Sequence, residues 1–334
     1  LARTTILQSS NSDSAALREW SRTTGSYAGR FRLLDQLHQS ETCVVFKGVD
    51  LERRRPHDAV AVKIMRKETE WNREVSARQE FQLDESHVVG IRQSMRIDPV
   101  ERAQRLRRQG VSRHIEDETE FLLAMPLGEC SLFDAVSSER KVGRDVEWVR
   151  SAVEYMAECL HHLHQQGMVH SDVKPRNFCR FKDEDGSSRL CVIDMDAASR
   201  IGERLLSRDA GLKASTAYAP PELVTHILLG TEEPPVSASS VDSWSLGAVL
   251  YELASGLPLF NADRSDDNLN DSTSKIELLN WRTIDGARLA RVFAECSTCT
   301  DTQRSAAQNL IAWCLQADPG QRPTMGEVLA HRFI

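Results

Sequence analysis

The most informative stretch of this sequence is HSDVKPRN, which spans His170–Asn177. Its aspartate is followed two residues later by a lysine and five residues later by an asparagine. In this arrangement Asp172 can orient the proton of an attacking hydroxyl, and Lys174 can neutralise a phosphoryl group in transfer. The amide oxygen of Asn177 can bind a magnesium ion. A charged loop after a helix is the ordinary alternative, but the order of these side chains favours phosphoryl-transfer chemistry.

Downstream of this octet an apolar run ends in a carboxylate. Cys191, Val192 and Ile193 read as a strand, and Asp194 follows, seventeen residues after Asn177. An isolated Asp after a strand is usually a turn residue. Magnesium, however, commonly binds one or two carboxylates together with phosphate. At this distance from the octet, Asp194 is therefore a candidate metal ligand.

Upstream of the octet a lysine lies inside an apolar strand. Lys63 belongs to the run Val60–Ile64, where a lysine either faces solvent or is held against an anion. An acid on the following helix would then be its partner, and Glu74 and Glu80 are the candidates. These two residues are six positions apart, about 240° around a helix, so they cannot both face Lys63.

The chain is predicted to have a β-rich first part and a helical second part. Short apolar stretches predict strands at residues 31–34, 43–46, 59–64 and 121–125. Helix formers or apolar residues at helical spacing predict helices over residues 67–82, 146–165, 244–253 and 306–315. Residues 1–28 are predicted to be an extension that is partly helical around 14–20, and the charged stretch 92–120 a surface insertion between strands.

The composition is that of an ordinary globular chain. It has 334 residues, of which 40% are hydrophobic and 27% charged, with a net charge of −7. This charge argues against a general nucleic-acid-binding surface, and no apolar run approaches the ~20 residues that span a bilayer. Eight scattered cysteines are interpreted as reduced thiols, which fits a cytoplasmic protein or the cytosolic domain of a larger one. Because the chain begins at Leu1 without a visible signal peptide, we expect it to be part of a longer protein.

The segments around Lys63, the octet and Asp194 resemble the protein kinase family, and the resemblance covers residues 31–334. The octet resembles the catalytic loop, Asp194 the first residue of the magnesium triad, and Lys63 the phosphate-orienting lysine. Lys174 is the serine/threonine form of that loop. The sequence at residues 193–198 and 214–218 is similar to that of kinases from oomycetes, related algae and some amoebae. Three further motifs follow in the family's order: APPE at 219–222, which closes the activation segment; DSWSLG at 242–247, which anchors the catalytic loop; and DPGQRP at 318–323, whose Arg322 pairs with Glu222.

The resemblance implies an α+β, bilobal protein kinase fold with a small β-rich N-lobe and a larger, mainly helical C-lobe. The expected boundaries are 1–28 for the extension, 29–125 for the N-lobe and 126–334 for the C-lobe. The implied function is phosphoryl transfer from ATP, with Mg²⁺, to Ser or Thr of a protein substrate. The alternative is a pseudokinase that acts as a nucleotide-binding or scaffold module. The oligomeric state stays open.

The catalytic roles follow from the same resemblance. Lys63 would hold the α- and β-phosphates, and its partner would be Glu74, which fits the residues that follow it better than Glu80 does. Either Ser215 or Thr216 is expected to contact the catalytic aspartate. The remaining implied roles are hydroxyl orientation by Asp172, stabilisation of the transferring group by Lys174, and magnesium binding by Asn177 and Asp194.

The nucleotide pocket is implied in the same way. Adenine would meet the Met125 carbonyl and the Leu127 amide, and Pro126, which has no N–H, falls where no amide is needed. Ala124 is then expected to be the gatekeeper and to open the pocket behind adenine, whereas a one-residue slip would make Leu123 the gatekeeper and close it. The full set of expected nucleotide contacts is Val45, Ala61, Lys63, Met125, Leu127, Ser131, Cys179 and Asp194.

The chain departs from the family at four places. The loop 37–45 contains none of the usual three glycines, so we expect it to be stiffer and ATP binding to be weaker. Ser171 replaces the arginine that pairs with a phosphorylated activation segment, so activity is not expected to depend on phosphorylation of residues 195–215. Asp196 replaces a glycine, which we expect to remove a flexible joint; the alternative is that this second carboxylate contacts the metal. Arg78 occupies an interior position that is usually apolar, for which the sequence offers no reason.

Overall fold

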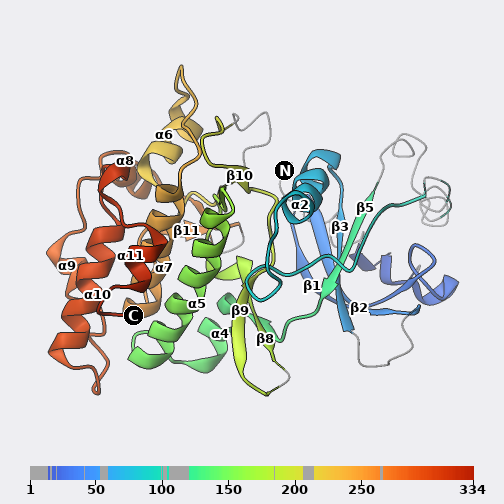
Figure 1. Cartoon of the computed structure of the whole chain (residues 1–334), viewed down its shortest axis with the longest axis horizontal. Coiled ribbons are helices and arrows are strands. Elements are labelled where there is room, and N and C mark those ends of the chain that lie inside the picture. The colour runs from blue at the N-terminus through green and yellow to red at the C-terminus, as the bar shows by residue number, and fades with distance from the viewer. Residues whose placement is uncertain are drawn as a thin grey trace. The chain divides into compact units, whose positions relative to one another are not determined.

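The computed structural model describes residues 14–15, 17–19, 21–40, 42–52, 59–98, 100, 104, 120–183, 185–205, 214–263 and 266–334 (Figure 1). Contacts divide the chain into two compact units. The first unit comprises Leu1–Arg78 and Val89–Gly128, and the second comprises Gln79–Val88 and Glu129–Ile334. The first unit is built on a β-sheet and the second mainly from helices, which confirms the predicted α+β, two-lobed class.

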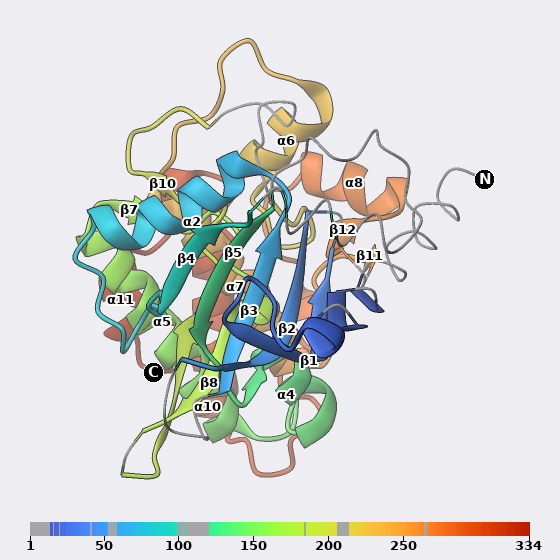
Figure 2. The ribbon, with the colours of Figure 1, turned by 90° about the vertical axis from the view of Figure 1, so that its right-hand side faces the viewer.

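The first unit contains a five-stranded antiparallel sheet in the order β1-β2-β3-β5-β4 (Figure 2). Alternating burial along the strands gives the sheet two distinct faces. The four predicted strand regions are confirmed. The strand bounds are β1 Phe31–Gln39, β2 Cys43–Asp50, β3 Ala59–Met65, β4 Gln93–Arg96 and β5 Phe121–Pro126.

Strand β4 corrects the interpretation of the stretch 92–120. Its residues pair with β5, so the start of that stretch belongs to the sheet and not to an insertion. The Ile97 N–H donates to the Glu120 carbonyl at 2.9 Å and brings the two ends of the intervening segment together. Apart from Ile97, Asp98, Val100, Gln104 and Glu120, the residues of that segment lie outside the described part of the chain.

Each face of the sheet carries its own apolar cluster. One face packs Val44, Val62 and Ala124 with Leu17 and Tyr27 from the N-terminal segment. That segment is thus part of the first unit's core, and its described residues between 14 and 24 are helical. The other face packs Met65, Phe121 and Leu123 against Trp71 and Val75. The last two residues belong to helix α2 (Glu68–Glu80), which confirms the helix predicted at 67–82.

The second unit is organised around helix α7 (Ser239–Ser255), most of which is buried. Helix α5 (Val146–Gln165) begins where the side chain of Asp145 accepts the Trp148 N–H at 3.0 Å. The predicted helices at 146–165, 244–253 and 306–315 correspond to α5, α7 and α10. The other helices are α4 Leu132–Glu139, α6 Pro221–Leu229, α8 Ser272–Leu279, α9 Gly286–Leu289, α10 Asp301–Cys314 and α11 Met325–Leu329, with 3₁₀ turns η2 Pro175–Asn177 and η4 Pro319–Gln321.

Short paired strands fix the positions of loops in the second unit. They form three small antiparallel sheets, β6-β8-β9, β7-β10 and β11-β12. Their bounds are β6 Cys130–Ser131, β7 Met168–Val169, β8 Phe178–Lys182, β9 Ser188–Val192, β10 Ser199–Arg200, β11 Ala262–Asp263 and β12 Asn268–Leu269. Among the described residues, no helix is both long enough and apolar enough to cross a bilayer.

Candidate active site

Lys63 of β3 is buried and contacts Glu74 of α2. Its Nζ lies 2.5 Å from Oε1 of Glu74, and both side chains are nearly inaccessible to solvent. The geometry thus selects Glu74 over Glu80, which pairs with Arg200 in the second unit at 2.6 Å. A buried cation of this kind requires an anionic partner, which accounts for the lysine in an apolar strand.

The contacts of Arg78 explain why an arginine occupies this interior position. It contacts Oε2 of Glu74 and donates to the Glu74 carbonyl at 3.1 Å and to the Val89 carbonyl at 2.7 Å. Each carboxylate oxygen of Glu74 therefore has one cationic partner, Lys63 on Oε1 and Arg78 on Oε2. The arginine thus holds one oxygen of the glutamate and the lysine holds the other.

The strand register corrects the predicted gatekeeper. Ala124 pairs with Val62, and both belong to the apolar cluster on the face away from Lys63. Residues directly opposite each other on antiparallel strands project from the same face. Leu123, which pairs with Lys63, and Met125, which pairs with Ala61, are thus on the lysine's face. The register therefore does not fit Ala124 as the gatekeeper, whereas Leu123, the alternative, lies on the face of Lys63.

The remaining first-unit nucleotide residues share the face of Lys63. Val45 pairs directly with Lys63, and Ala61 lies two residues before it on the same strand. Met125 lies opposite Ala61. Val45 and Ala61 are only half-buried, whereas their strand neighbours on the other face are in the core. These four residues therefore form one continuous, partly open strip. Leu127 follows directly after β5.

Two predicted nucleotide residues of the second unit also lie together. Ser131 and Cys179 are directly paired between β6 and β8. The Ser131 hydroxyl donates to Oδ2 of Asp134 at 2.7 Å and accepts the Asp134 N–H at 3.1 Å, since it caps helix α4. A ribose hydroxyl would have to share this side chain with the cap.

The glycine-free loop forms a tight turn between β1 and β2. The Ser40 N–H donates to the Cys43 carbonyl at 2.9 Å. The Ser40 hydroxyl accepts the N–H groups of Thr42 at 3.3 Å and Cys43 at 3.2 Å. A serine side chain therefore organises the turn, in the manner of short polar residues elsewhere.

The catalytic loop is held by Asp242 of helix α7. Its carboxylate accepts the N–H of His170 at 2.8 Å and the N–H of Ser171 at 2.9 Å, and it lies 2.9 Å from His164 Nε2. Ser171 has φ +67°, a left-handed backbone that few non-glycine residues adopt. Asp242 thus holds the loop in a strained turn immediately before Asp172, as predicted for the anchoring helix.

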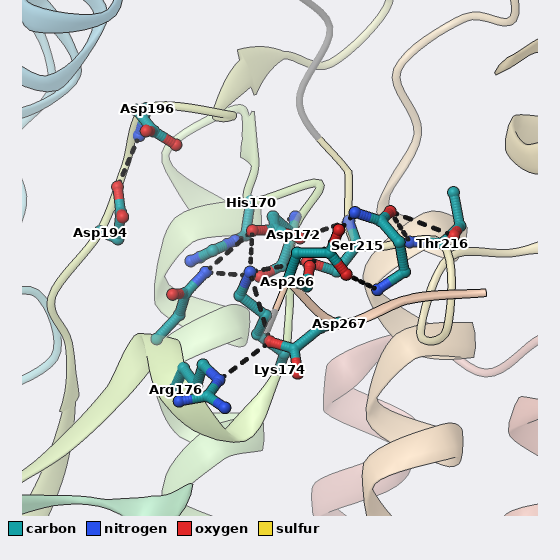
Figure 3. A network of polar contacts seen from close by, with 12 residues as sticks. His170, Asp172, Lys174, Arg176, Asp194, Asp196, Ser215, Thr216, Asp266 and Asp267 are labelled. Carbon is teal, nitrogen blue, oxygen red and sulfur yellow. Dashed lines mark hydrogen bonds and ion pairs between the residues drawn. The ribbon is translucent and has the colours of Figure 1, made fainter. Parts of the chain in front are cut away.

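Asp172 is surrounded by donors (Figure 3). Its Oδ1 accepts the Ser215 N–H at 2.8 Å. Its Oδ2 lies 3.0 Å from Lys174 Nζ and accepts the Asn177 side-chain amide at 3.2 Å. Lys174 also donates to the Ser215 hydroxyl at 2.6 Å. Of the two candidates in the activation segment, Ser215 is therefore the residue whose N–H contacts Asp172.

The charges of Asp172 and Lys174 stabilise each other. Burial by itself raises the pKa of the Asp172 carboxyl, but Lys174, His170 and the Ser215 N–H outweigh this effect, so the pKa lies below its ordinary value. Burial lowers the pKa of the Lys174 ammonium, but the charges of Asp172 and Asp267 raise it by more than burial lowers it. The pKa of Lys174 therefore lies above its ordinary value. Both groups are therefore charged at neutral pH.

Asn177 and Asp194 offer oxygen ligands in neighbouring positions. The Asn177 side-chain nitrogen donates to the Asp172 carbonyl at 2.8 Å, which leaves its amide oxygen for another ligand. The Ile193 N–H donates to the Asn177 carbonyl at 3.0 Å. This bond holds the backbone next to Asp194 against that of Asn177. The Asp196 N–H donates to Oδ1 of Asp194 at 3.2 Å. A hard oxygen set of this kind fits Mg²⁺.

The sequence analysis did not predict Asp267, a further carboxylate of the site. Asp267, in the β11–β12 hairpin, lies 3.1 Å from Arg176 Nε and 3.8 Å from Lys174 Nζ (Figure 3). Burial raises the pKa of Asp267 more than Lys174 and Arg176 lower it. No local pattern signals this role, because the hairpin is about ninety positions away in sequence.

The motifs after the activation segment meet as predicted. Arg322 donates to both oxygens of Glu222, at 2.7 and 2.9 Å. Residues 206–213 of the activation segment lie outside the described part of the chain. The expectation that Asp196 removes a flexible joint stays a prediction, but its backbone is not left-handed, so glycine is not needed there.

A sheet with a buried lysine–glutamate pair and a helical unit with an Asp-Lys-Asn loop together define the protein kinase class. The protein kinase domain family matches residues 31–334, and the chain belongs to this family.

Curated relatives share a modest identity with the chain. Dual specificity tyrosine-phosphorylation-regulated kinase 2 of Drosophila melanogaster is 25% identical over 66% of this chain and 32% of that protein. The calcium and calcium/calmodulin-dependent serine/threonine-protein kinase of Oryza sativa subsp. japonica is 31% identical over 59% of this chain and 33% of that protein. Serine/threonine-protein kinase 36 of Mus musculus is 27% identical over 66% of this chain and 14% of that protein. The chain thus spans about a third or less of these relatives' lengths.

Proposed function

We propose that this domain transfers the γ-phosphoryl group of ATP to serine or threonine hydroxyls of a protein substrate. The observation that carries the proposal is the geometry around Asp172, whose carboxylate is charged, oriented by Ser215 and Asn177, and paired with Lys174. A binding module has no chemical need for such a set. The names of the relatives support the serine/threonine class.

In the proposed reaction Asp172 orients the substrate hydroxyl and takes its proton. The hydroxyl oxygen forms a bond to the γ-phosphorus while the bond between that phosphorus and the leaving ADP oxygen breaks. Lys174 stabilises the charge of the transferring group. Lys63, fixed by Glu74, binds the α- and β-phosphates. Catalysis of this kind depends on positioning and electrostatics rather than on covalent chemistry.

Asn177 and Asp194 would hold Mg²⁺ through their oxygens. When bound, the ion neutralises phosphate charge and orients the nucleotide. Val45, Ala61 and Met125 would contact adenine, since they lie on the face of Lys63. The tight turn at Ser40 brings no glycine to the phosphates, so we expect weak ATP binding.

The test is phosphate transfer from radiolabelled ATP to a generic protein substrate, followed by phosphoamino-acid analysis. We expect label on serine and threonine, and a fall of about 100-fold or more in the Asp172→Asn variant. The variant keeps the size of the side chain, so its thermal unfolding should stay close to that of the parent. Equal signals from both proteins would rule out the proposed activity.

A pseudokinase is the second candidate, and the glycine-free loop at Ser40 favours it. Nucleotide binding measured by calorimetry with and without Mg²⁺ separates the two functions. A scaffold would bind nucleotide without transferring phosphate, or would not bind it at all, whereas an active kinase should bind ATP more tightly when Mg²⁺ is present.

A further inference from the structure

The β11–β12 hairpin, between helices α7 and α8, reaches the catalytic loop. Asp267 lies at its end, buried, with φ +58°. Its Oδ2 is 3.1 Å from Arg176 Nε and 3.8 Å from Lys174 Nζ. Arg176 is further fixed by the ring of Phe133, whose centroid lies 3.5 Å from the guanidinium carbon. Two cations of the catalytic loop are thus directed at one carboxylate, as Figure 3 shows.

The same hairpin holds the end of the activation segment. The Thr216 hydroxyl donates to the Asn268 side-chain oxygen at 3.1 Å and accepts the Leu269 N–H at 2.9 Å. The Thr216 N–H donates to the same Asn268 oxygen at 3.3 Å, and the Ala217 N–H donates to the Asp267 carbonyl at 3.2 Å. Four hydrogen bonds therefore fix the residues next to Ser215, which itself contacts Asp172 and Lys174.

Near the start of the segment, the position of the family's arginine is occupied by a serine that contacts other hydroxyl groups. Ser171, which stands where the family has an arginine, lies 3.4 Å from the Ser199 hydroxyl. Ser199 lies 2.7 Å from the Ser237 hydroxyl. A chain of three hydroxyls cannot bind a phosphate in the bidentate manner of arginine. The anion that faces Lys174 and Arg176 is Asp267, a residue of the chain itself.

We infer that Asp267 is a positioning residue that holds Lys174 and residues 215–217 in the active arrangement, in place of a phosphate on the activation segment. The inference rests on the proposed phosphoryl transfer. Asp267 touches neither the hydroxyl nor the phosphates; it acts through Lys174, Arg176 and the backbone of Ala217. The domain then needs no upstream kinase to order this segment.

The test compares Asp267→Asn with Asp266→Asn in the full chain after treatment with a general protein phosphatase. Asparagine, like aspartate, is tolerated at positive φ. The first variant therefore removes the charge of Asp267 and should leave the turn intact. Asp266 is the matched control: it is exposed, and its Oδ1 accepts the Asn268 N–H at 3.0 Å, a bond that asparagine can also make. The readouts are kcat, the KM for ATP, and hydrogen exchange of residues 214–219.

We expect the dephosphorylated parent and Asp266→Asn to be equally active. Asp267→Asn should lower kcat by about 10- to 100-fold, the size of a small misplacement of catalytic groups. Its KM for ATP should be unchanged, because neither Asp267 nor its contacts Lys174, Arg176 and Ala217 are among the residues expected to contact the nucleotide. Exchange at 214–219 should become faster in this variant alone. A fall in kcat and a rise in KM together with lost thermal stability would indicate a merely structural role and overturn the inference.

Two other outcomes overturn the inference: loss of the parent's activity on dephosphorylation, or equal kcat and equal exchange in both variants. If the parent itself transfers no phosphate, the proposed function fails, and the exchange measurement alone then decides whether Asp267 holds the segment. If Asp267→Asn does not fold, Asn268→Ala removes the acceptor of Thr216, and unchanged exchange at 214–219 in that variant contradicts the inference.

Discussion

At the scale of single residues, the least expected contact is that of Arg78 with Glu74. The side chain of Glu74 is fully buried and has a cation on each oxygen, Lys63 on one and Arg78 on the other. A buried charge that loses one partner is costly, because the remaining group keeps its desolvation penalty. Arg78 is therefore expected to act on ATP binding through Glu74 and not by packing alone.

Replacing Arg78 with methionine should weaken ATP binding by roughly tenfold, the equivalent of about 1.4 kcal/mol, which is near the lower end for a hydrogen bond to a charged group. Initial rates over a range of ATP concentrations measure the effect. The exposed Asn72 on the same helix gives the control, Asn72→Ala, which should behave as the parent. In a Glu74→Gln background the Arg78→Met change should have little further effect; an undiminished effect there would mean that Arg78 does not work through Glu74.

At the scale of elements, helices α7 and α10 approach at a glycine. A Cβ built on Gly247 would lie 2.5 Å from the Cβ of Cys314 and 3.3 Å from Leu315 side-chain atoms. Backbone-attached atoms cannot move aside as a flexible side-chain end can. The DSWSLG motif therefore serves packing at Gly247 as well as loop anchoring at Asp242.

Gly247→Ala should destabilise the protein by about 1–3 kcal/mol, the usual cost of overpacking a core. Urea unfolding followed by circular dichroism measures it. Gly286→Ala is the matched control, since a Cβ on Gly286 meets no atom within 4 Å, and it should be neutral or slightly stabilising. Equal midpoints for both variants would show that the two helices separate easily.

A second element-scale feature is the stacked pair His87 and His162, whose ring centroids lie 4.9 Å apart. The Asp84 N–H donates to Nε2 of His162 at 2.9 Å, so that nitrogen carries no proton. Burial is the main cause that lowers the pKa of both rings. The charge of Arg189 beside His87, and those of His87 and His161 beside His162, lower it further, while Asp84 opposes the shift.

Because both pKa values are lower in the folded protein, the unfolded chain binds more protons below about pH 6.5. Stability is therefore fully present above that pH and is lost as the pH falls toward the folded-state values. Urea midpoints measured between pH 5 and 7.5 should decrease toward acid pH. His162→Gln keeps an acceptor for Asp84 and should flatten this dependence; a slope unchanged by the substitution would assign it to other groups.

At the scale of the whole molecule, the second unit is tied together by pairs between distant parts of the chain. Arg322, whose side chain is 0% exposed, pairs with Glu222, one hundred positions earlier. It also donates to the carbonyls of Gln316, Ser240 and Ala317. These contacts join the end of the activation segment to the last helices of the unit.

Arg322→Met should cost about 3 kcal/mol, because it leaves Glu222 and several carbonyls without a donor. The control is Arg144→Met, which breaks a pair with Glu295 whose side chains are 60% and 74% exposed, and which should cost at most about 1 kcal/mol. Both values come from chemical unfolding. Similar losses of unfolding free energy in the two variants would contradict the prediction that the Arg322 contacts stabilise the unit more than an exposed ion pair does.

The sequence was sufficient to recognise the family and part of the secondary structure. Strand alternation and helical spacing are local properties, and they predicted strands β1, β2, β3 and β5 and helices α2, α5, α7 and α10. Strand β4 was missed, because its four residues, QSMR, carry too little apolar character. The catalytic octet could be recognised because its residues are neighbours in the chain and their spacing is fixed by one short loop.

Only the tertiary structure decided which distant side chains meet. Glu74 rather than Glu80 contacts Lys63, because a helix presents only one of them to the lysine's face of the sheet. Ala124 turned out to lie on the wrong face, since a shift of one residue in register reverses every side chain of a strand. Asp267 joined the catalytic loop through a hairpin with no motif of its own. Contacts of this kind depend on how separate elements pack, which local spacing does not encode.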